Sequence, residues 1–81
     1  MQLDIYKRPE SHHKLSFLAV PAGQPIPEEA TNVDWIPQAR DVALDESAAS
    51  FAEYGIDRPG DQIREKGYAI TGLRHQVEAN D

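Results

Sequence analysis

Histidines are the residues in this sequence best suited to chemistry near neutral pH, and the chain contains three of them. His12 and His13 are adjacent, Glu10 lies two residues before His12, and His75 lies near the carboxyl-terminal end. Imidazole nitrogens and a carboxylate can bind zinc, and a histidine can transfer protons because imidazole titrates near neutral pH. The sequence therefore offers one candidate metal or acid–base site, formed by Glu10, His12 or His13, and His75.

The direction of the strand that precedes His75 decides whether these side chains meet. If that strand runs parallel to the first strand of the sheet, it ends beside the loop that holds His12 and His13. If it runs antiparallel to the first strand, the histidines lie at opposite ends of the sheet. Adjacent residues of an extended chain also point to opposite faces, so His12 and His13 rarely bind one metal together. Surface histidines without a site are the favoured interpretation, and the metal site is the alternative.

Other signatures of catalysis are missing from the sequence. There is no cysteine, which excludes disulfides and thiolate ligands. The chain has no Asp-x-Asp-x-Asp-Gly calcium loop and no glycine-rich phosphate loop. Ser11 beside His12 does not supply the geometry of a catalytic triad. We therefore predict no catalytic residue and no cofactor, and we favour a non-enzymatic role over a weak enzyme.

Acidic side chains are concentrated in the middle of the chain. The net charge is −6, and residues 28–61 contain nine acidic and two basic side chains. Such a segment repels phosphate backbones, which makes nucleic acid a disfavoured partner. Four carboxylates of this segment are candidates for docking a basic protein partner: Glu28, Glu29, Asp45 and Glu46. Two simpler interpretations stay open, namely a solvated surface that maintains solubility and first-turn residues that complement helix dipoles.

The elements that would position these residues begin with a hairpin. Residues 2–8 alternate apolar and polar side chains, and residues 14–20 form a second, more apolar run. The turn-type residues 9–13 between them predict an antiparallel β-hairpin. On the second strand Leu15, Phe17 and Ala19 share one face, whereas Leu18 and Val20 share the other. Leu18 and Val20 either pack inside the domain, which we favour, or form a patch that binds a second copy.

The middle of the chain is harder to interpret. The three prolines of residues 21–27 predict a surface crossing, and residues 27–30 fit one helical turn. Residues 32–42 fit extended chain or a short strand broken by Pro37, with Trp35 and Ile36 as core anchors. Residues 45–54 have apolar side chains at helical spacing and are followed by Gly55, which predicts a helix capped by Asp45 or Ser47.

The last third of the chain predicts a second short helix and a strand. Asp57 is a candidate N-cap, Pro59 suits the first turn, and Gly67 suits the end of the helix. Residues 68–73 predict an inner strand, with Gly72 marking a bulge or a close backbone approach. Residues 76–81 are polar, and we expect them to fray.

These elements together predict an α+β fold for a single domain of residues 1–81. An antiparallel N-terminal hairpin and a C-terminal strand share one sheet, and one or two short helices cover one face. No run of residues approaches the length of a membrane span, and no export signal is recognisable. We therefore expect a cytoplasmic protein that is not membrane-bound.

Several motifs resemble those of a known family. They are Asp4-Ile-Tyr-Lys-Arg-Pro9, the run from Leu15 to Pro27, Asp34-Trp35, Tyr54-Gly-Ile-Asp57, Gln62-Ile63 and Gly67-Tyr-Ala-Ile70. The chain resembles short proteobacterial proteins classified only as a domain of unknown function. This resemblance implies a stand-alone bacterial protein and assigns no role to any residue. The functional expectation is a non-catalytic protein-interaction or regulatory module that binds a protein partner or a second copy. The alternative is a small metal- or metabolite-binding protein, or a weak enzyme, that uses the histidines.

Overall fold

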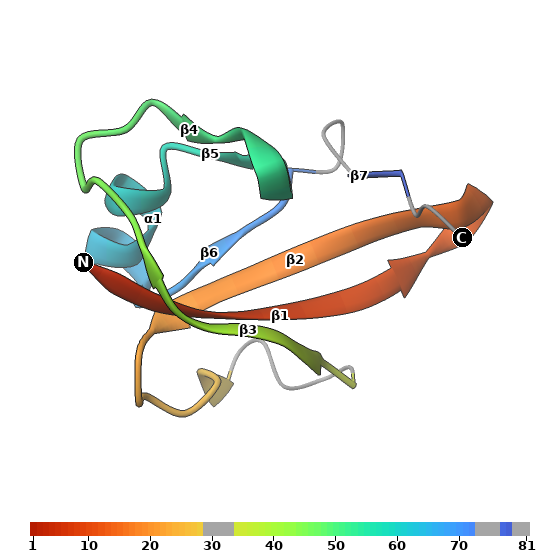
Figure 1. Ribbon diagram of the computed structural model, residues 1–81, viewed down its shortest axis with the longest axis horizontal. Helices are drawn as coiled ribbons and strands as arrows, with labels where there is room; N and C mark the ends of the chain where they lie inside the picture. The colour runs from red at the N-terminus through yellow and green to blue at the C-terminus, as the bar shows by residue number, and fades with distance from the viewer. Residues whose placement is uncertain (29–33, 73–76, 79–81) are drawn as a thin grey trace.

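The computed structural model describes residues 1–28, 34–72 and 77–78, and it confirms an α+β fold built on an antiparallel sheet. The sheet contains β1 (Gln2–Glu10), β2 (Lys14–Pro21), β3 (Ile36–Ala43) and β6 (Ala69–Ile70), in the order β3-β1-β2-β6 (Figure 1). A short strand, β7 (Val77–Glu78), also pairs with β2. Two further strands, β4 (Ser50–Phe51) and β5 (Ile56–Asp57), form a separate ribbon.

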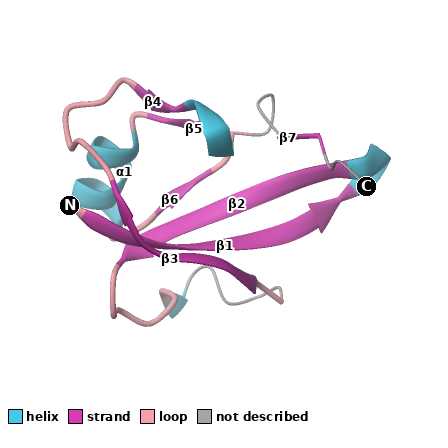
Figure 2. Ribbon diagram, in the orientation of Figure 1, coloured by secondary structure: helices cyan, strands magenta, loops and turns pink. Residues whose placement is uncertain are grey.

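Helices occupy a small part of the chain (Figure 2). The α-helix α1 spans Pro59–Lys66, and it lies with the β4–β5 ribbon on one side of the sheet (Figure 1). Two 3-10 helices complete the described elements, namely η1 (Ser11–His13) and η3 (Ala52–Tyr54). None of the helices in the described part of the chain has the length and apolarity needed to cross a bilayer.

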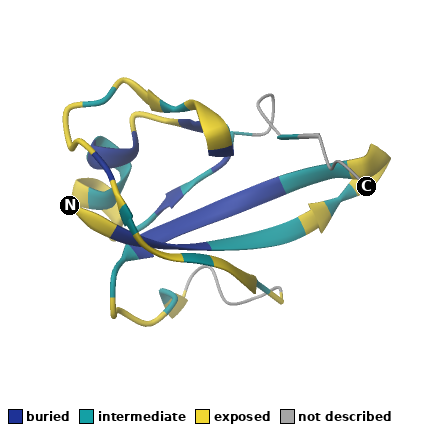
Figure 3. Ribbon diagram, in the orientation of Figure 1, coloured by how far each residue is buried: buried dark blue, intermediate teal, exposed yellow. Residues whose placement is uncertain are grey.

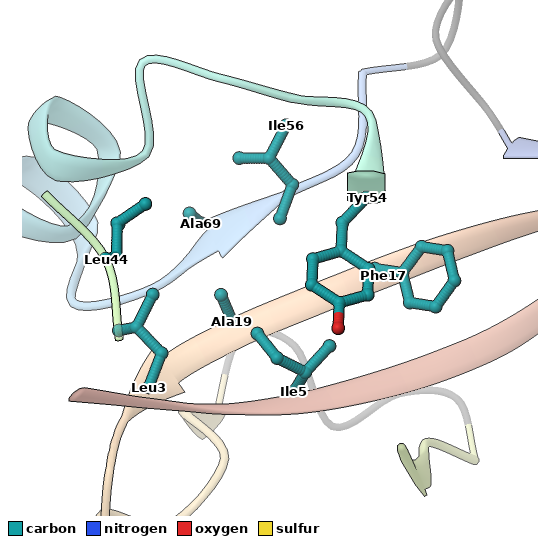
Figure 4. Close-up of a cluster of buried hydrophobic side chains, with 8 residues drawn as sticks. All are labelled: Leu3, Ile5, Phe17, Ala19, Leu44, Tyr54, Ile56 and Ala69. Carbon is teal, nitrogen blue, oxygen red and sulfur yellow. The ribbon is translucent and has the colours of Figure 1, made fainter. Parts of the chain in front are cut away.

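The N-terminal hairpin is confirmed, with an uninterrupted register from Leu3 opposite Pro21 to Glu10 opposite Lys14. Because the side chains of the hairpin alternate between its two faces, they contribute to two separate hydrophobic cores. On one face Leu3, Ile5, Phe17 and Ala19 pack with residues of the helical side, as Figure 4 shows. The complete buried cluster on this face is Leu3, Ile5, Phe17, Ala19, Leu44, Tyr54, Ile56 and Ala69.

The opposite face of the hairpin carries a second, smaller core. Leu18 and Val20 are fully buried, at 0% exposure, and central β2 is the most buried strand (Figure 3). They pack against Ile26 and Trp35 from the segment between β2 and β3. The expectation that Leu18 and Val20 pack inside the domain is therefore confirmed, and their burial requires no second copy of the chain.

The predicted helix over residues 45–54 is wrong. The Asp45 carboxylate accepts hydrogen bonds from the backbone N–H (2.9 Å) and the hydroxyl (2.8 Å) of Ser47. These local bonds favour a turn over continued helix, and the chain then forms β4 and η3. The apolar residues of the segment nevertheless reach the core, since Leu44 is buried and Ala48 and Phe51 pack against it. Gly55 does end a helix in the left-handed conformation, at φ 64°, but this helix is η3.

Pro37 does not break the strand that contains it. β3 runs through eight residues and, among the described strands, pairs only with β1, so it is an edge strand. An edge strand tolerates proline because one side of its backbone makes no ladder bonds. Of the two predicted core anchors, Trp35 packs half-buried on the second core, whereas Ile36 is 45% exposed and its assignment was wrong.

The second predicted helix exists, but Asp57 does not cap it. The N-cap of α1 is Arg58, in the left-handed conformation and without a side-chain cap bond, while Gly67 ends the helix as predicted. The Gln62 amide donates to the carbonyl of Asp57 (2.6 Å), and its oxygen accepts from the N–H of Ile70 (3.1 Å). These two bonds connect α1 to the chain on both sides of it.

The predicted inner strand over residues 68–73 is reduced to the two residues of β6. Among the described strands, β6 pairs only with β2 and so lies at the edge of the sheet. The close backbone approach expected at Gly72 is present, since its N–H donates to the carbonyl of Gly55 (3.2 Å). Of the residues expected to fray, 76 and 79–81 lie outside the described residues, as do residues 29 and 30 of the predicted turn at 27–30.

Candidate functional site

The histidine pair lies at the exposed end of the hairpin, where η1 connects β1 to β2. His12 and His13 both have positive φ, at 60° and 58°, a conformation that costs a non-glycine residue free energy. The Glu10 carboxylate accepts a bond from the Arg8 guanidinium at 2.6 Å and is therefore already paired. Among the described residues, no group of three or more metal-binding side chains has the geometry of a metal site.

The strand directions meet the condition on which the histidine site depended. β6 is antiparallel to β2, which is itself antiparallel to β1, so β6 runs in the same direction as β1. β7 then pairs with Lys14 and Leu15 beside the hairpin end. His75 itself lies outside the described residues. The backbone thus brings the chain after β6 towards the hairpin end, while the described side chains supply no ligand set.

The four acidic candidates do not come together. Ile26, two residues before Glu28, packs on the second core. Leu44 and Ala48, which flank Asp45 and Glu46, pack on the first core instead. Glu28 therefore belongs to the covering segment of one face of the sheet, and Asp45 and Glu46 belong to that of the other. Glu29 lies outside the described residues.

Asp45 and Glu46 belong to a larger group of carboxylates, here called the acidic layer. It lies in the segment from residue 45 to 61, which packs on the first core and contains a single basic side chain, Arg58. All of its carboxylates have solvent-accessible side chains. They are Asp45, Glu46, Glu53, Asp57 and Asp61. Sequence reasoning recognised the acidic segment but did not predict that Glu53 and Asp57 would share this layer with Asp45 and Glu46.

Local contacts modify two members of the acidic layer. The hydrogen bonds from Ser47 hold the pKa of the Asp45 carboxyl below its ordinary value, so Asp45 stays ionised in mild acid. Asp61 forms an ion pair with Arg64 one helical turn later on α1. The charge of Asp45 is therefore retained in mild acid, whereas the charge of Asp61 is offset by that of Arg64.

A half-open pocket of about 280 Å³ lies on the β4–β5 ribbon within the acidic layer. Ser50 and Asp57 are directly opposite each other in the ribbon, so their side chains share one face. The alternate residues, Phe51 and Ile56, pack into the first core. The pocket is lined by Ser50, Ala52, Gly55, Ile56 and Asp57. It combines one carboxylate and one hydroxyl with largely uncharged walls.

One buried carboxylate was missed at the sequence level. The alternation of residues 2–8 assigned Asp4 to a polar face, yet Asp4 is only 5% exposed. It accepts hydrogen bonds from the N–H groups of Gly23 (3.0 Å) and Asp41 (3.2 Å), with Arg40 at 3.8 Å. These two backbone donors hold the pKa of Asp4 below its ordinary value. Asp4 therefore connects the turn after β2 to edge strand β3.

The sequence comparisons place the chain in a family. The chain belongs to a family of unknown function (DUF6139), whose sequence model matches residues 1–77. No curated protein and no solved structure matches the chain. The family confirms the resemblance to a domain of unknown function and assigns no activity to any residue.

Proposed function

We propose that this protein is a non-catalytic interaction or regulatory module of the bacterial cytosol, which docks a basic protein partner on its acidic layer. The observation that carries the proposal is the imbalance of charge on that layer. Between residues 45 and 61 there are five carboxylates and one guanidinium. Such a field attracts cationic partners over a distance of about a Debye length, roughly 8–10 Å at physiological salt.

Two basic side chains of the described residues lie over aromatic rings. The Arg8 guanidinium lies 4.8 Å from the ring centroid of Trp35, and the Lys66 ammonium lies 4.9 Å from that of Tyr68. Both rings pack on the second core, on the face of the sheet opposite the acidic layer. Arg8 and Lys66 are therefore engaged with aromatic rings of the second core.

The bacterial and cytosolic parts of the proposal have separate supports. The sequence motifs resemble those of short proteobacterial proteins, and the chain has no cysteine that would benefit from an oxidising compartment.

The partner is either a different protein or a second copy of this chain. Sedimentation measures self-association before any capture experiment.

The test is affinity capture from a lysate of the host organism with two matched variants. Glu46→Lys with Glu53→Lys reverses two charges of the acidic layer. Glu28→Lys with Asp34→Lys reverses two charges on the segment that covers the second core. We expect the first variant to lose a partner that the wild type and the second variant retain. Equal retention by both variants, at unchanged thermal stability, would contradict docking through the acidic layer.

The alternative function is a metal- or metabolite-binding protein that uses the hairpin end. The observation that favours it is the pairing of β7 with Lys14 and Leu15, beside His12 and His13. Zinc should then shift the amide resonances of the hairpin end and of β7 together. Shifts confined to one segment, or no shifts, would rule this alternative out.

A further inference from the structure

We propose that the side chain of Asp4 fixes a β-bulge in β3 and thereby prevents this edge strand from pairing with β3 of a second copy of the chain. Within the described part of the chain β3 pairs only with β1, and six of its eight residues are exposed (Figure 3). The free edge of such a strand is a template for pairing with another chain, unless some feature of the strand interrupts it. The inference is independent of the proposed function, because β3 ends before the acidic layer begins.

The register between β1 and β3 contains an extra residue in β3. Leu3 lies opposite Val42, and two residues later in β1 Ile5 lies opposite Ala39. The single residue between these two β1 positions therefore faces two residues of β3, which is the definition of a β-bulge. One of the two, Asp41, has φ 53°. The bulge lets Ala39 and Val42 both pack on the first core, although residues three apart in a regular strand point to opposite faces.

Side chains of β1 bind both backbone groups of the bulged residue Asp41. The buried Asp4 carboxylate accepts a hydrogen bond from the Asp41 N–H at 3.2 Å. The Gln2 side-chain amide donates to the Asp41 carbonyl at 3.0 Å. The other oxygen of Asp4 accepts from the Gly23 N–H at 3.0 Å, which holds the carboxylate in place. The bulge is therefore fastened to β1, and its backbone groups are already bonded within the domain.

Two interruptions leave little of the outer edge of β3 for pairing. Pro37 has no N–H to donate, and the backbone groups of Asp41 are bonded to β1. The uninterrupted stretch between them is residues 38–40, whereas strands of globular proteins usually contain about five to six residues. Without the bulge, the stretch from residue 38 to the end of β3 at Ala43 would reach that length. The bulge therefore keeps the free edge too short to pair stably.

The test deletes Asp41 from the full chain, which removes the bulge and keeps the register pairs on both sides of it. We expect the sedimenting mass of this variant to double relative to the wild type as the concentration is raised. Antiparallel pairing of two β3 edges about a two-fold axis closes at two copies, so larger species are not expected. Amide hydrogen exchange should be slowed within residues 38–43. Asp4→Ala, which removes the acceptor of the Asp41 N–H, should show both changes to a smaller extent.

Two controls separate edge pairing from a general loss of stability. Thr71→Val removes a buried hydroxyl that bonds to the Phe17 N–H of β2, and it leaves the bulge intact. This variant should sediment as the wild type does. Gln38→Lys, added to the deletion variant, should restore the wild-type mass, because a lysine on an exposed edge strand disfavours pairing.

Three results would overturn the inference. They are an unchanged mass of the deletion variant, an equal gain of mass in Thr71→Val, and slowed exchange that lies outside β3. If the deletion variant does not fold, Asp4→Ala decides, and wild-type mass and exchange in that variant would overturn the inference as well. None of these results bears on docking through the acidic layer, which is tested by partner loss in the Glu46→Lys, Glu53→Lys variant.

Discussion

The hydroxyl of Thr71 accepts a hydrogen bond from the backbone N–H of Phe17 at 2.7 Å, while the N–H of Thr71 donates to the Phe17 carbonyl at 3.0 Å. The same hydroxyl lies 2.6 Å from the carbonyl of Tyr54, to which it donates. Thr71 is buried, so its side chain satisfies a buried β2 amide and connects β2 to η3. The two hydrogen bonds between Thr71 and Phe17 therefore continue the pairing with β2 one residue beyond the end of β6.

Replacing Thr71 by valine tests this connection. Valine retains the shape of threonine but leaves the Phe17 amide and the Tyr54 carbonyl without the hydroxyl. We expect the free energy of unfolding to fall by about 1–3 kcal/mol, the usual cost of an unsatisfied buried polar group. Urea denaturation measures the change, and Thr71→Ser, which keeps the hydroxyl, should lose less. Equal losses in the two variants would show that packing of the methyl group matters more than the hydrogen bonds.

Gly60 allows α1 to approach the loop after β3. A Cβ atom at this position would lie 2.2 Å from the carbonyl oxygen of Glu46, and both Gly60 and Pro59 are buried. Gly60→Ala should therefore lower the free energy of unfolding by about 1–3 kcal/mol, as overpacking does in other domains. In an exposed helix the same substitution would stabilise by about 1 kcal/mol. A stabilised Gly60→Ala variant in thermal unfolding would contradict this close approach.

Asp4 makes the stability of the domain depend on pH in the acid range. Its pKa is held below 3.8 in the folded state by the N–H groups of Gly23 and Asp41. A carboxyl whose pKa is depressed by folding stabilises the folded state above the pKa of the unfolded chain. That contribution is lost as the pH falls from about 3.8 through the folded-state pKa.

The measurement is the unfolding midpoint as a function of pH for the wild type, Asp4→Asn and Asp45→Asn. Asp45 also has a lowered pKa, so part of the acid loss belongs to it. We expect Asp4→Asn to be less stable than the wild type at neutral pH and to show a weaker decline in acid. An acid decline as steep in Asp4→Asn as in the wild type would exclude Asp4 as its source.

His13 stands in a conformation that glycine adopts more readily, at φ 58°. A left-handed conformation costs an L-residue roughly 1–2 kcal/mol, while glycine adds about 0.5–1 kcal/mol of chain entropy to the unfolded state. His13→Gly should therefore stabilise the domain by about 0.5–1 kcal/mol. A β-branched residue is least compatible with positive φ, so His13→Val should destabilise it. Thermal unfolding of the wild type and both variants checks the prediction, and a His13→Gly variant less stable than the wild type would contradict it.

The local spacing of apolar residues was sufficient to predict the hairpin, but it was insufficient to predict the structure of residues 45–54. The alternation of Leu3 and Ile5, and of Phe17 and Ala19, corresponds to one buried face because strand side chains alternate with period two. Leu44, Ala48 and Phe51 also matched a period, that of a helix. The same three residues reach the first core from a turn and a short strand, because Asp45 and Ser47 form local bonds that compete with helix.

The candidate site was predictable in its residue types but not in its geometry. The acidic segment and the surface histidines are evident from composition and spacing. The separation of Glu28 from Asp45 and Glu46 depends on which face of the sheet each connection covers, and no local pattern encodes that choice. Asp4 illustrates the same limit, since its partners Gly23 and Asp41 lie 19 and 37 residues away.

The sequence by itself determined the α+β class, the register of the hairpin faces, the turn residues Gly55 and Gly67, and membership of the family. These properties follow from the periodicity of apolar residues, from backbone preferences and from short sequence motifs, each of which can be recognised within a few neighbouring residues. Only the tertiary structure decided that β3 is an edge strand containing Pro37, that Asp4 is buried, and that Ser50 and Asp57 line one pocket. Those properties depend on contacts between segments distant in the chain, whose free energies exist only when the whole domain is folded.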